Sequence, residues 1–114
     1  MARLGTSIWV SAYLLRLSLE GIYAHVTKKG AATAGAVAIK LALMNGEASF
    51  FTRGYGADGK LSWHAQMEAT DEAQVDAALA RQRRYDPDLW VIEIEDPRGR
   101  HMLDDPGLSG ETED

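Results

Sequence analysis

The dipeptide Asn45-Gly46 lies between two runs of alternating apolar residues and constrains the fold more than any other feature of the sequence. Asn-Gly is the strongest short signal for a β-hairpin, because a type I′ turn requires positive φ at both of its central residues. The flanking runs are residues 36–44 and residues 47–53. The sequence therefore predicts two antiparallel strands joined by a type I′ turn at Asn45-Gly46.

Three further segments have the period of two that is typical of β-strands. They are residues 22–28, residues 60–67 and residues 89–95. Residues 54–59 contain three glycines with the spacing of a dinucleotide-binding loop, but no helix follows them, so we interpret this segment as a turn between strands. Strands that follow one another in this way favour an antiparallel meander with one covered face.

Residues 7–20 have helical periodicity, with Thr6 or Ser7 as the N-cap and Gly21 as the terminator. At about 100° per residue this helix has two apolar faces. One face comprises Val10, Tyr13, Leu14 and Leu17, and the other comprises Ile8, Ala12, Leu15 and Leu19. One face can cover a sheet, and we expect the second to pack against another helix or a second copy of the protein.

Residues 71–85 are predicted to form a second helix, with Thr70 as its N-cap and Pro87 preventing its continuation. A stripe of small residues lies beside its apolar face and could meet the second face of the first helix. The stripe is Ala73, Ala77 and Ala80. The predicted fold is α+β, an antiparallel sheet of about five strands with two helices packed on it, in the order α-β-β-β-β-α-β.

Charge is distributed unevenly along the 114 residues, which have a net charge of −5. Residues 104–114 hold five of the 17 acidic side chains and none of the 12 basic ones, so residues 1–103 are neutral. We expect residues 1–103 to form a single α+β domain. We expect residues 104–114 to be a disordered acidic tail, because they carry too few apolar side chains to offset the entropy of ordering.

The absence of cysteine excludes disulfides, thiolate metal sites and cysteine nucleophiles. No run approaches 18 apolar residues, so no membrane-spanning segment is expected. Residues 1–17 faintly resemble a signal peptide but lack a clear cleavage site. We therefore expect a cytoplasmic protein.

Several sequence features are concentrated in residues 81–96, RQRRYDPDLWVIEIED. A basic helix end is followed there by an Asp-Pro-Asp corner and then by an apolar strand. Together with GIYAHVTKKG at residues 21–30 and AGAVAIKL at residues 34–41, this stretch resembles an uncharacterised family of short alphaproteobacterial proteins, catalogued as domain of unknown function 1491. The similarity extends from residue 3 to about residue 104. The resemblance implies a stand-alone, cytoplasmic bacterial protein, and it implies no activity, substrate or cofactor.

The same stretch contains the candidate site. Arg81, Arg83 and Arg84 could bind phosphate, although cations are also expected at a helix C-terminus because of the helix dipole. Glu93 could act as a general acid or base if burial raised its pKa, or it could pair with an arginine of the preceding helix. The candidate ligand or partner site comprises Arg81, Arg84, Tyr85, Asp88 and Glu93.

Other chemistries have no support in the sequence. His25, His64 and His101 lie on separate strands or strand ends without the spacing of metal ligands, so no metal site is predicted. No phosphate-binding loop is present, and no cofactor is predicted. The neutral body lacks a basic stripe, so nucleic-acid binding is not expected.

Two functional hypotheses follow. The first is a non-enzymatic interaction module that self-associates, as a homodimer, through residues 7–20 or through an open sheet edge. The alternative is a small enzyme or a binder of an anionic or phosphate ligand that uses the corner from Arg81 to Glu95. The apolar surface of residues 7–20 exceeds what one small sheet can cover, and this excess favours the first hypothesis. The sequence identifies no protein partner.

Overall fold

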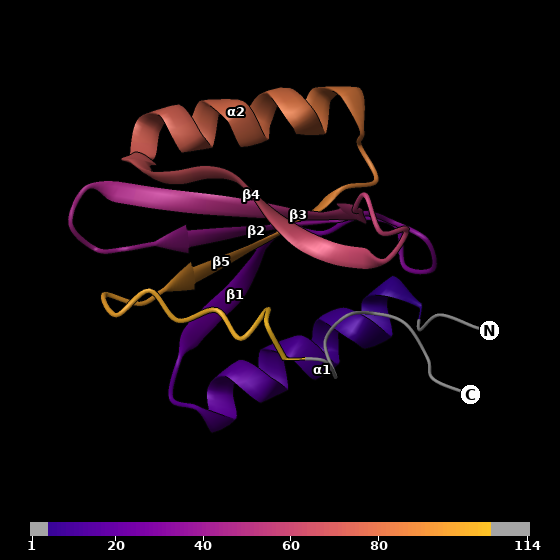
Figure 1. The fold of residues 1–114 in the computed structure, drawn as a ribbon, viewed down its shortest axis with the longest axis horizontal. Coiled ribbons are helices and arrows are strands. Elements are labelled where there is room, and N and C mark those ends of the chain that lie inside the picture. Colours follow the sequence, from indigo (N-terminus) through magenta and orange to yellow (C-terminus); the bar gives the residue numbers. More distant parts are fainter. Residues whose placement is uncertain (1–4, 106–114) are drawn as a thin grey trace.

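The structure, a computed structural model, describes residues 5–105 and confirms the α+β class and the predicted order of elements (Figure 1). In chain order the elements are α1 (Thr6–Leu19), β1 (Tyr23–Lys28), β2 (Val37–Ala42), β3 (Glu47–Tyr55), β4 (Leu61–Asp71), α2 (Glu72–Tyr85) and β5 (Trp90–Glu95). Most of the predicted acidic tail, residues 106–114, lies outside the described residues. Asp105 is described, and its carboxylate forms an ion pair with Arg16 of α1 at 3.2 Å.

Within the described residues the strands form one mixed sheet in the order β1-β5-β2-β3-β4. Of the predicted antiparallel meander, the β2-β3 and β3-β4 pairs form, but β1 does not pair with β2. However, β5 is inserted between β1 and β2, antiparallel to β1 and parallel to β2, so the prediction of a purely antiparallel sheet is wrong. The reason is that β5 carries buried apolar side chains on both of its faces and needs cover on both, whereas the more polar β1 tolerates the sheet edge.

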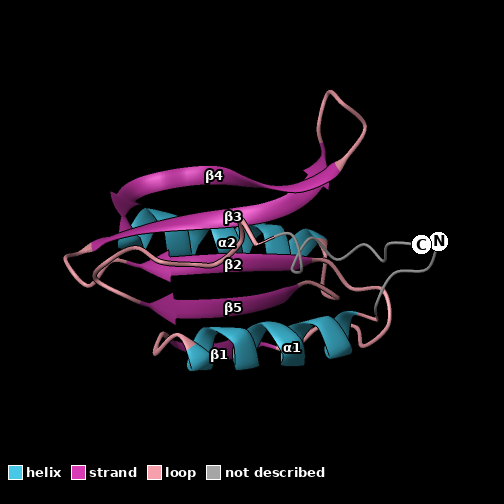
Figure 2. Ribbon diagram, turned by 60° about the horizontal axis from the view of Figure 1, so that its bottom comes forward, coloured by secondary structure: helices cyan, strands magenta, loops and turns pink. Residues whose placement is uncertain are grey.

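The helices α1 and α2 lie on opposite faces of this sheet (Figures 1 and 2). On one face, α1 packs against Ile39 of β2 and Ile92 of β5. On the other face, Val75 and Leu79 of α2 pack against Val91 of β5. The suggested contact between the alanine stripe and the second face of the first helix is therefore wrong, because the sheet separates the two helices.

Only one of the two predicted apolar faces of α1 is buried. Tyr13 and Leu17 are fully buried, and Trp9 joins them with only 2% of its surface exposed. The opposite face remains open to solvent and is here called the α1 outer face. It comprises Ile8, Ala12, Leu15 and Leu19, and the three large residues among them are 61%, 61% and 71% exposed.

The hairpin of β2 and β3 forms at the predicted place, but its turn differs from the prediction. Positive φ occurs at Met44 (64°) and Gly46 (92°) and not at Asn45. The side-chain oxygen of Asn45 instead accepts a hydrogen bond from the Glu47 amide at 3.0 Å. The predicted type I′ turn at Asn45-Gly46 is wrong, because β2 ends at Ala42 and leaves a connection longer than two residues.

The helices begin one residue away from the predicted caps. The N-cap of α1 is Gly5, and Thr6 lies inside the helix. The N-cap of α2 is Asp71, and Thr70 belongs to β4. Gly21 follows α1 with a φ of 73°, which confirms its predicted role as terminator. No helix in residues 5–105 has the length and apolar character needed to cross a membrane.

Candidate functional site

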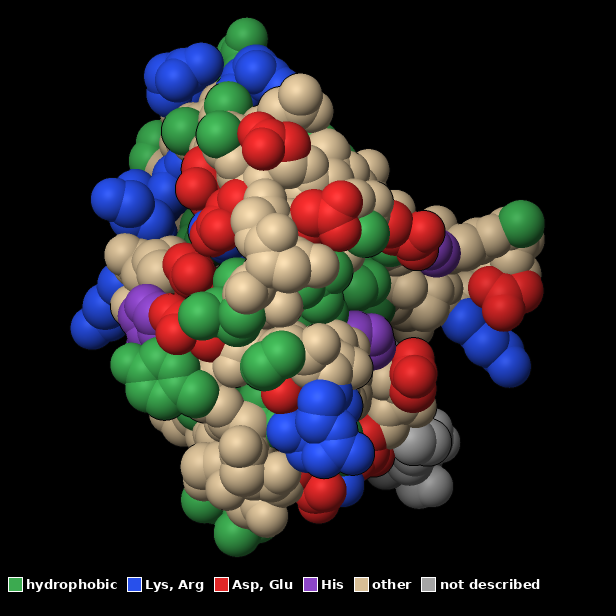
Figure 3. Space-filling model, turned by 90° about the vertical axis from the view of Figure 1, so that its left-hand side faces the viewer, with side chains coloured by type: hydrophobic (Ala, Val, Ile, Leu, Met, Phe, Trp, Pro, Cys, Tyr) green, Lys and Arg blue, Asp and Glu red, His purple; other side chains and the backbone are tan. Residues whose placement is uncertain are grey.

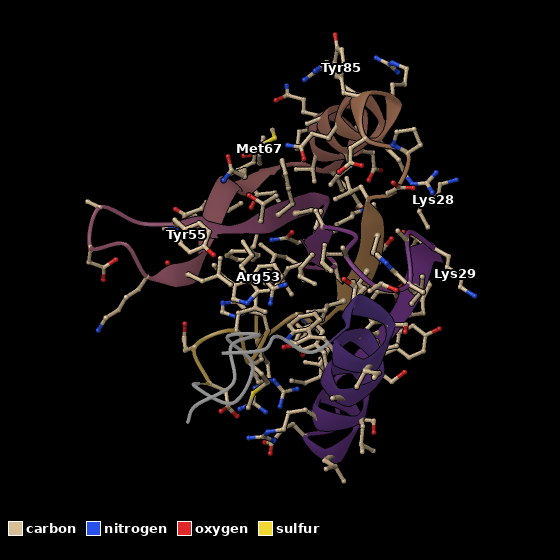
Figure 4. All side chains as sticks on the ribbon, turned by 90° about the vertical axis from the view of Figure 1, so that its right-hand side faces the viewer. Lys28, Lys29, Arg53, Tyr55, Met67 and Tyr85 are labelled. Carbon is tan, nitrogen blue, oxygen red and sulfur yellow. The ribbon has the colours of Figure 1, made fainter. Side chains whose placement is uncertain are left out.

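Part of the sheet face under α2 is open. α2 packs mainly over β2, β3 and β4 and leaves β1 and part of β5 uncovered on this side. A groove of about 410 Å³ lies in this opening and is here called the α2–β1 groove. Its floor is apolar and consists of Leu79, Ala80 and Val91. Figure 4 shows Lys28, at the end of β1, on the same side of the sheet as α2.

Lys40 is the buried charge of this groove, with 5% of its surface exposed. Its amine lies 2.7 Å from carboxylate oxygens of Glu72 and Asp76 on α2, and 3.6 Å from Glu93 on β5. Burial alone would lower the pKa of Lys40, but the hydrogen bonds to Asp76 and Glu72 and the charge of Glu93 outweigh it, so the pKa is raised. Lys40 is therefore a cation at neutral pH, and its amine is not the neutral nucleophile that imine chemistry requires.

The strand register extends this polar centre into a row across the sheet. His25 of β1 is opposite Glu93 of β5, and Glu93 is opposite Lys40 of β2. Residues at paired positions point to the same face, so all three lie on the α2 side. Nδ1 of His25 is buried and has no hydrogen-bond partner in the described part of the chain.

The end of the groove near the C-terminus of α2 is basic. Lys28 and Arg84 line it, are exposed, and form no ion pair with residues 5–105. Arg83 has a different role, because its guanidinium donates hydrogen bonds to the carbonyl oxygens of Leu89 at 3.0 Å and Lys29 at 2.9 Å. Arg83 therefore holds the connection between α2 and β5 in place.

Asp88 belongs to a tightly packed backbone corner. Its carbonyl oxygen accepts a hydrogen bond from the Ala31 amide at 3.0 Å. Gly30 and Gly35 approach this oxygen so closely that a Cβ atom would lie 2.1 Å and 2.6 Å from it, respectively. Such distances exclude any larger residue at the two glycine positions unless the backbone moves.

The structure brings only part of the predicted site together. Arg84 and Glu93 line the α2–β1 groove, whereas Arg81, Tyr85 and Asp88 are not among its lining residues. Arg81 is exposed, and Tyr85, which is 85% exposed, lies beside a separate hollow that faces β3. Glu93 contacts Lys40 and not, as one hypothesis suggested, an arginine of the preceding helix.

Lys28, Lys40 and Asp76 are the charged residues of the groove that were not predicted from the sequence. A usable signal was present, because Lys40 is the single charged residue in the run AVAIKLALM, residues 36–44. A charge within an otherwise apolar strand must find buried partners if the strand is internal. Among residues 5–105, no three His, Asp or Glu side chains gather in a way that could hold a metal ion.

Comparison with known proteins finds a family model and several solved structures that are similar to this chain. A family model described as "Protein of unknown function (DUF1491)" matches residues 4–104. A crystal structure of a DUF1491 family protein from Caulobacter crescentus CB15 is 44% identical, with 88% of this chain and 94% of that chain covered and a TM-score of 0.80. An NMR structure of a DUF1491 family protein from the same organism is 42% identical, with 90% and 94% covered and a TM-score of 0.77. A solution structure of a protein from A. tumefaciens is 30% identical, with 82% and 86% covered and a TM-score of 0.71. No curated protein matches the chain.

Proposed function

Because the chain belongs to the DUF1491 family, whose description assigns no function, we propose from its geometry that it is a small binding protein whose α2–β1 groove takes a small molecule with an anionic group. One observation carries the proposal. Lys28 and Arg84 line a concave site with an apolar floor, and neither has an ion-pair partner within residues 5–105. Unpaired cations beside an apolar surface favour a ligand with a carboxylate or phosphate group and an apolar part.

The size and the charges of the groove support this assignment. Its volume of about 410 Å³ falls in the usual range for small-molecule sites, roughly 300–1,000 Å³. Lys40 contributes little attraction for an anion, because Glu72 and Asp76 already neutralise it at 2.7 Å. Recognition of the anionic group therefore depends on Lys28 and Arg84. The protonated Lys40 also favours binding over amine-dependent catalysis.

Calorimetric titration with inorganic phosphate and with octanoate tests the proposal. We expect at least one of these anions to bind, and we expect Arg84→Gln and Lys28→Gln each to weaken its binding roughly tenfold, the equivalent of one lost charge-assisted hydrogen bond. Arg81→Gln is the matched control, because Arg81 is an exposed arginine of the same helix outside the groove. Failure of the wild-type protein to bind either anion would contradict the proposal. So would a loss of affinity in Arg81→Gln equal to that in Arg84→Gln and Lys28→Gln.

The α1 outer face favours a second function, self-association with another copy of this chain. Ile8, Leu15 and Leu19 are each more than 60% exposed on one side of the helix. β1, which α1 packs against, is an edge strand of the sheet. A contiguous apolar helix face of this kind is typical of an interaction surface, and an interface between two such faces would bury apolar surface on both copies without burying a charge.

Sedimentation velocity over a range of concentrations tests this second function. We expect the wild-type protein to show a concentration-dependent increase in mass, and we expect Leu15→Gln to remain a monomer. Leu15 makes no contribution to the core, so the variant should retain its melting temperature when dilute. A wild-type protein that stays monomeric at the highest concentration measured would refute self-association through this face.

A further inference from the structure

We propose that the ligand of the α2–β1 groove is amphoteric, a small molecule with a cationic group at one end, an anionic group at the other and an apolar segment between them. The inference rests on the proposed function and specifies its ligand class. It comes from the separation of charge along the groove, which has an acidic end and a basic end.

The chain direction produces this separation. α2 and β5 run in opposite directions on either side of the connection between them (Figure 1). The first turns of α2 therefore lie beside the end of β5, and Asp76 and Glu93 both contact Lys40 there. The last turn of α2 carries Arg84 toward the beginning of β5, where Lys28 is paired with Val91.

The two ends of the groove have opposite net charge. At the acidic end, two carboxylates and one ammonium group line the groove and leave a net charge of −1. These groups are Asp76, Glu93 and Lys40, and Glu72 pairs with Lys40 from outside the lining. At the basic end, Lys28, Arg83 and Arg84 give a net charge of +3. Figure 3 shows acidic side chains gathered on the upper part of one face of the molecule, with basic side chains along the adjacent left edge.

Glu93 is the carboxylate of the groove that a cationic ligand group would meet. Its side chain is only 20% exposed, and its distance of 3.6 Å from the Lys40 amine is too long for a hydrogen bond. No side chain or amide in residues 5–105 donates a hydrogen bond to its carboxylate. Lys40 directs two of its three protons to Glu72 and Asp76, so within the described residues the partly exposed carboxylate of Glu93 has only a longer-range ion pair with Lys40. A ligand ammonium group would supply the missing donors.

The positions of these residues set the length of the ligand. Lys28 is paired with Val91 and therefore marks the basic end on the sheet. Val91 and Glu93 are two positions apart on β5, which corresponds to about 7 Å. Asp76 and Arg84 are eight positions apart on α2, which corresponds to about 12 Å. The ligand must therefore separate its charges by about 7–12 Å. Val91, Leu79 and Ala80 form the apolar floor between the two ends.

Calorimetric comparison of ω-aminooctanoate with octanoate tests the inference, because the two probes have the same apolar chain and carboxylate and differ in the terminal amine. We expect ω-aminooctanoate to bind roughly tenfold more tightly than octanoate, the equivalent of one added charge-assisted hydrogen bond. We expect Glu93→Gln to abolish this preference, so that the variant binds ω-aminooctanoate no more tightly than it binds octanoate. Arg84→Gln should weaken the binding of both probes by the same factor.

A second measurement uses the wild-type protein alone and does not depend on the folding of a variant. ω-Aminobutyrate is too short to reach both ends of the groove, so we expect it to bind no more tightly than butyrate. A preference of equal size at both chain lengths would overturn the inference, because it would show that the preference does not require contact with both ends of the groove.

The outcomes separate this inference from the proposed function. If octanoate binds as tightly as ω-aminooctanoate, the amphoteric ligand is refuted and anion binding stands. If the preference survives in Glu93→Gln, the assignment of the cationic end to Glu93 is overturned. If phosphate, octanoate and ω-aminooctanoate all fail to bind, both proposals are refuted.

Discussion

His101 is the residue whose protonation we expect to affect stability near neutral pH. Its Nδ1 accepts a hydrogen bond from the Leu103 amide at 3.0 Å, and its ring contacts Phe51 with 4.8 Å between centroids. Burial lowers the pKa of His101 below its usual value of about 6.5, against the opposing charge of Asp104. Since the folded-state pKa is depressed, the stabilisation is present above the unfolded-state pKa and is lost as the pH falls through the folded-state pKa.

Urea denaturation at about pH 7.5 and at about pH 5.5 measures this effect. We expect the wild-type free energy of unfolding to be lower at the acidic pH, by about 1 kcal/mol or less because solvent screens a partly exposed imidazole. His101→Asn keeps an acceptor for the Leu103 amide and does not titrate. The free energy of unfolding of this variant should therefore fall less between the two pH values. An equal loss in both proteins would assign the pH dependence to other groups.

At the scale of elements, α1 carries two apolar faces with different energetic roles. Leu17 is fully buried against the sheet, whereas Leu15, two positions away, is 61% exposed. We expect Leu17→Ala to lower the free energy of unfolding by about 3 kcal/mol, because it removes buried methyl groups and leaves a cavity. Leu15→Ala should change it by less than about 0.5 kcal/mol in a dilute monomer.

Chemical denaturation of both variants at low protein concentration provides the comparison. The two substitutions are the same and lie on the same helix, so their difference in helix propensity cancels. Equal destabilisation of the two variants would show that the α1 outer face is not open in the monomer. A destabilisation of Leu15→Ala that grows with protein concentration would instead support self-association.

At the scale of the whole molecule, β5 holds the two halves of the sheet together. It lies between β1 and β2 and carries the apolar residues that both layers need, including Ile92 and Val91. We expect a fragment of residues 1–88 to lack a cooperative thermal transition by circular dichroism, because α1 and α2 lose their shared support. A synthetic peptide of residues 89–105 should restore structure when mixed with the fragment. Cooperative unfolding of the fragment alone would refute this role of β5.

Part of the fold and part of the site could be predicted from local patterns. Gly21 ended α1 and Pro87 followed α2 as expected, because backbone preferences act within a few residues. Arg84 and Glu93 were chosen from their place near a helix end and on an apolar strand, and both line the groove. Asn45-Gly46 shows the limit of such patterns, since the hairpin formed while the detailed turn depended on where β2 ended.

The sequence by itself determined the kind and order of the elements, because propensity, capping and apolar periodicity are local properties. Only the tertiary structure decided that β5 enters the sheet between β1 and β2, since both of its faces needed a covering layer. The same strand order created the site. Lys40 meets Glu72, 32 positions further along the chain, only because β2 became an internal strand beneath α2. Contacts at such separation depend on which surfaces the folded chain buries together, and no local pattern specifies them.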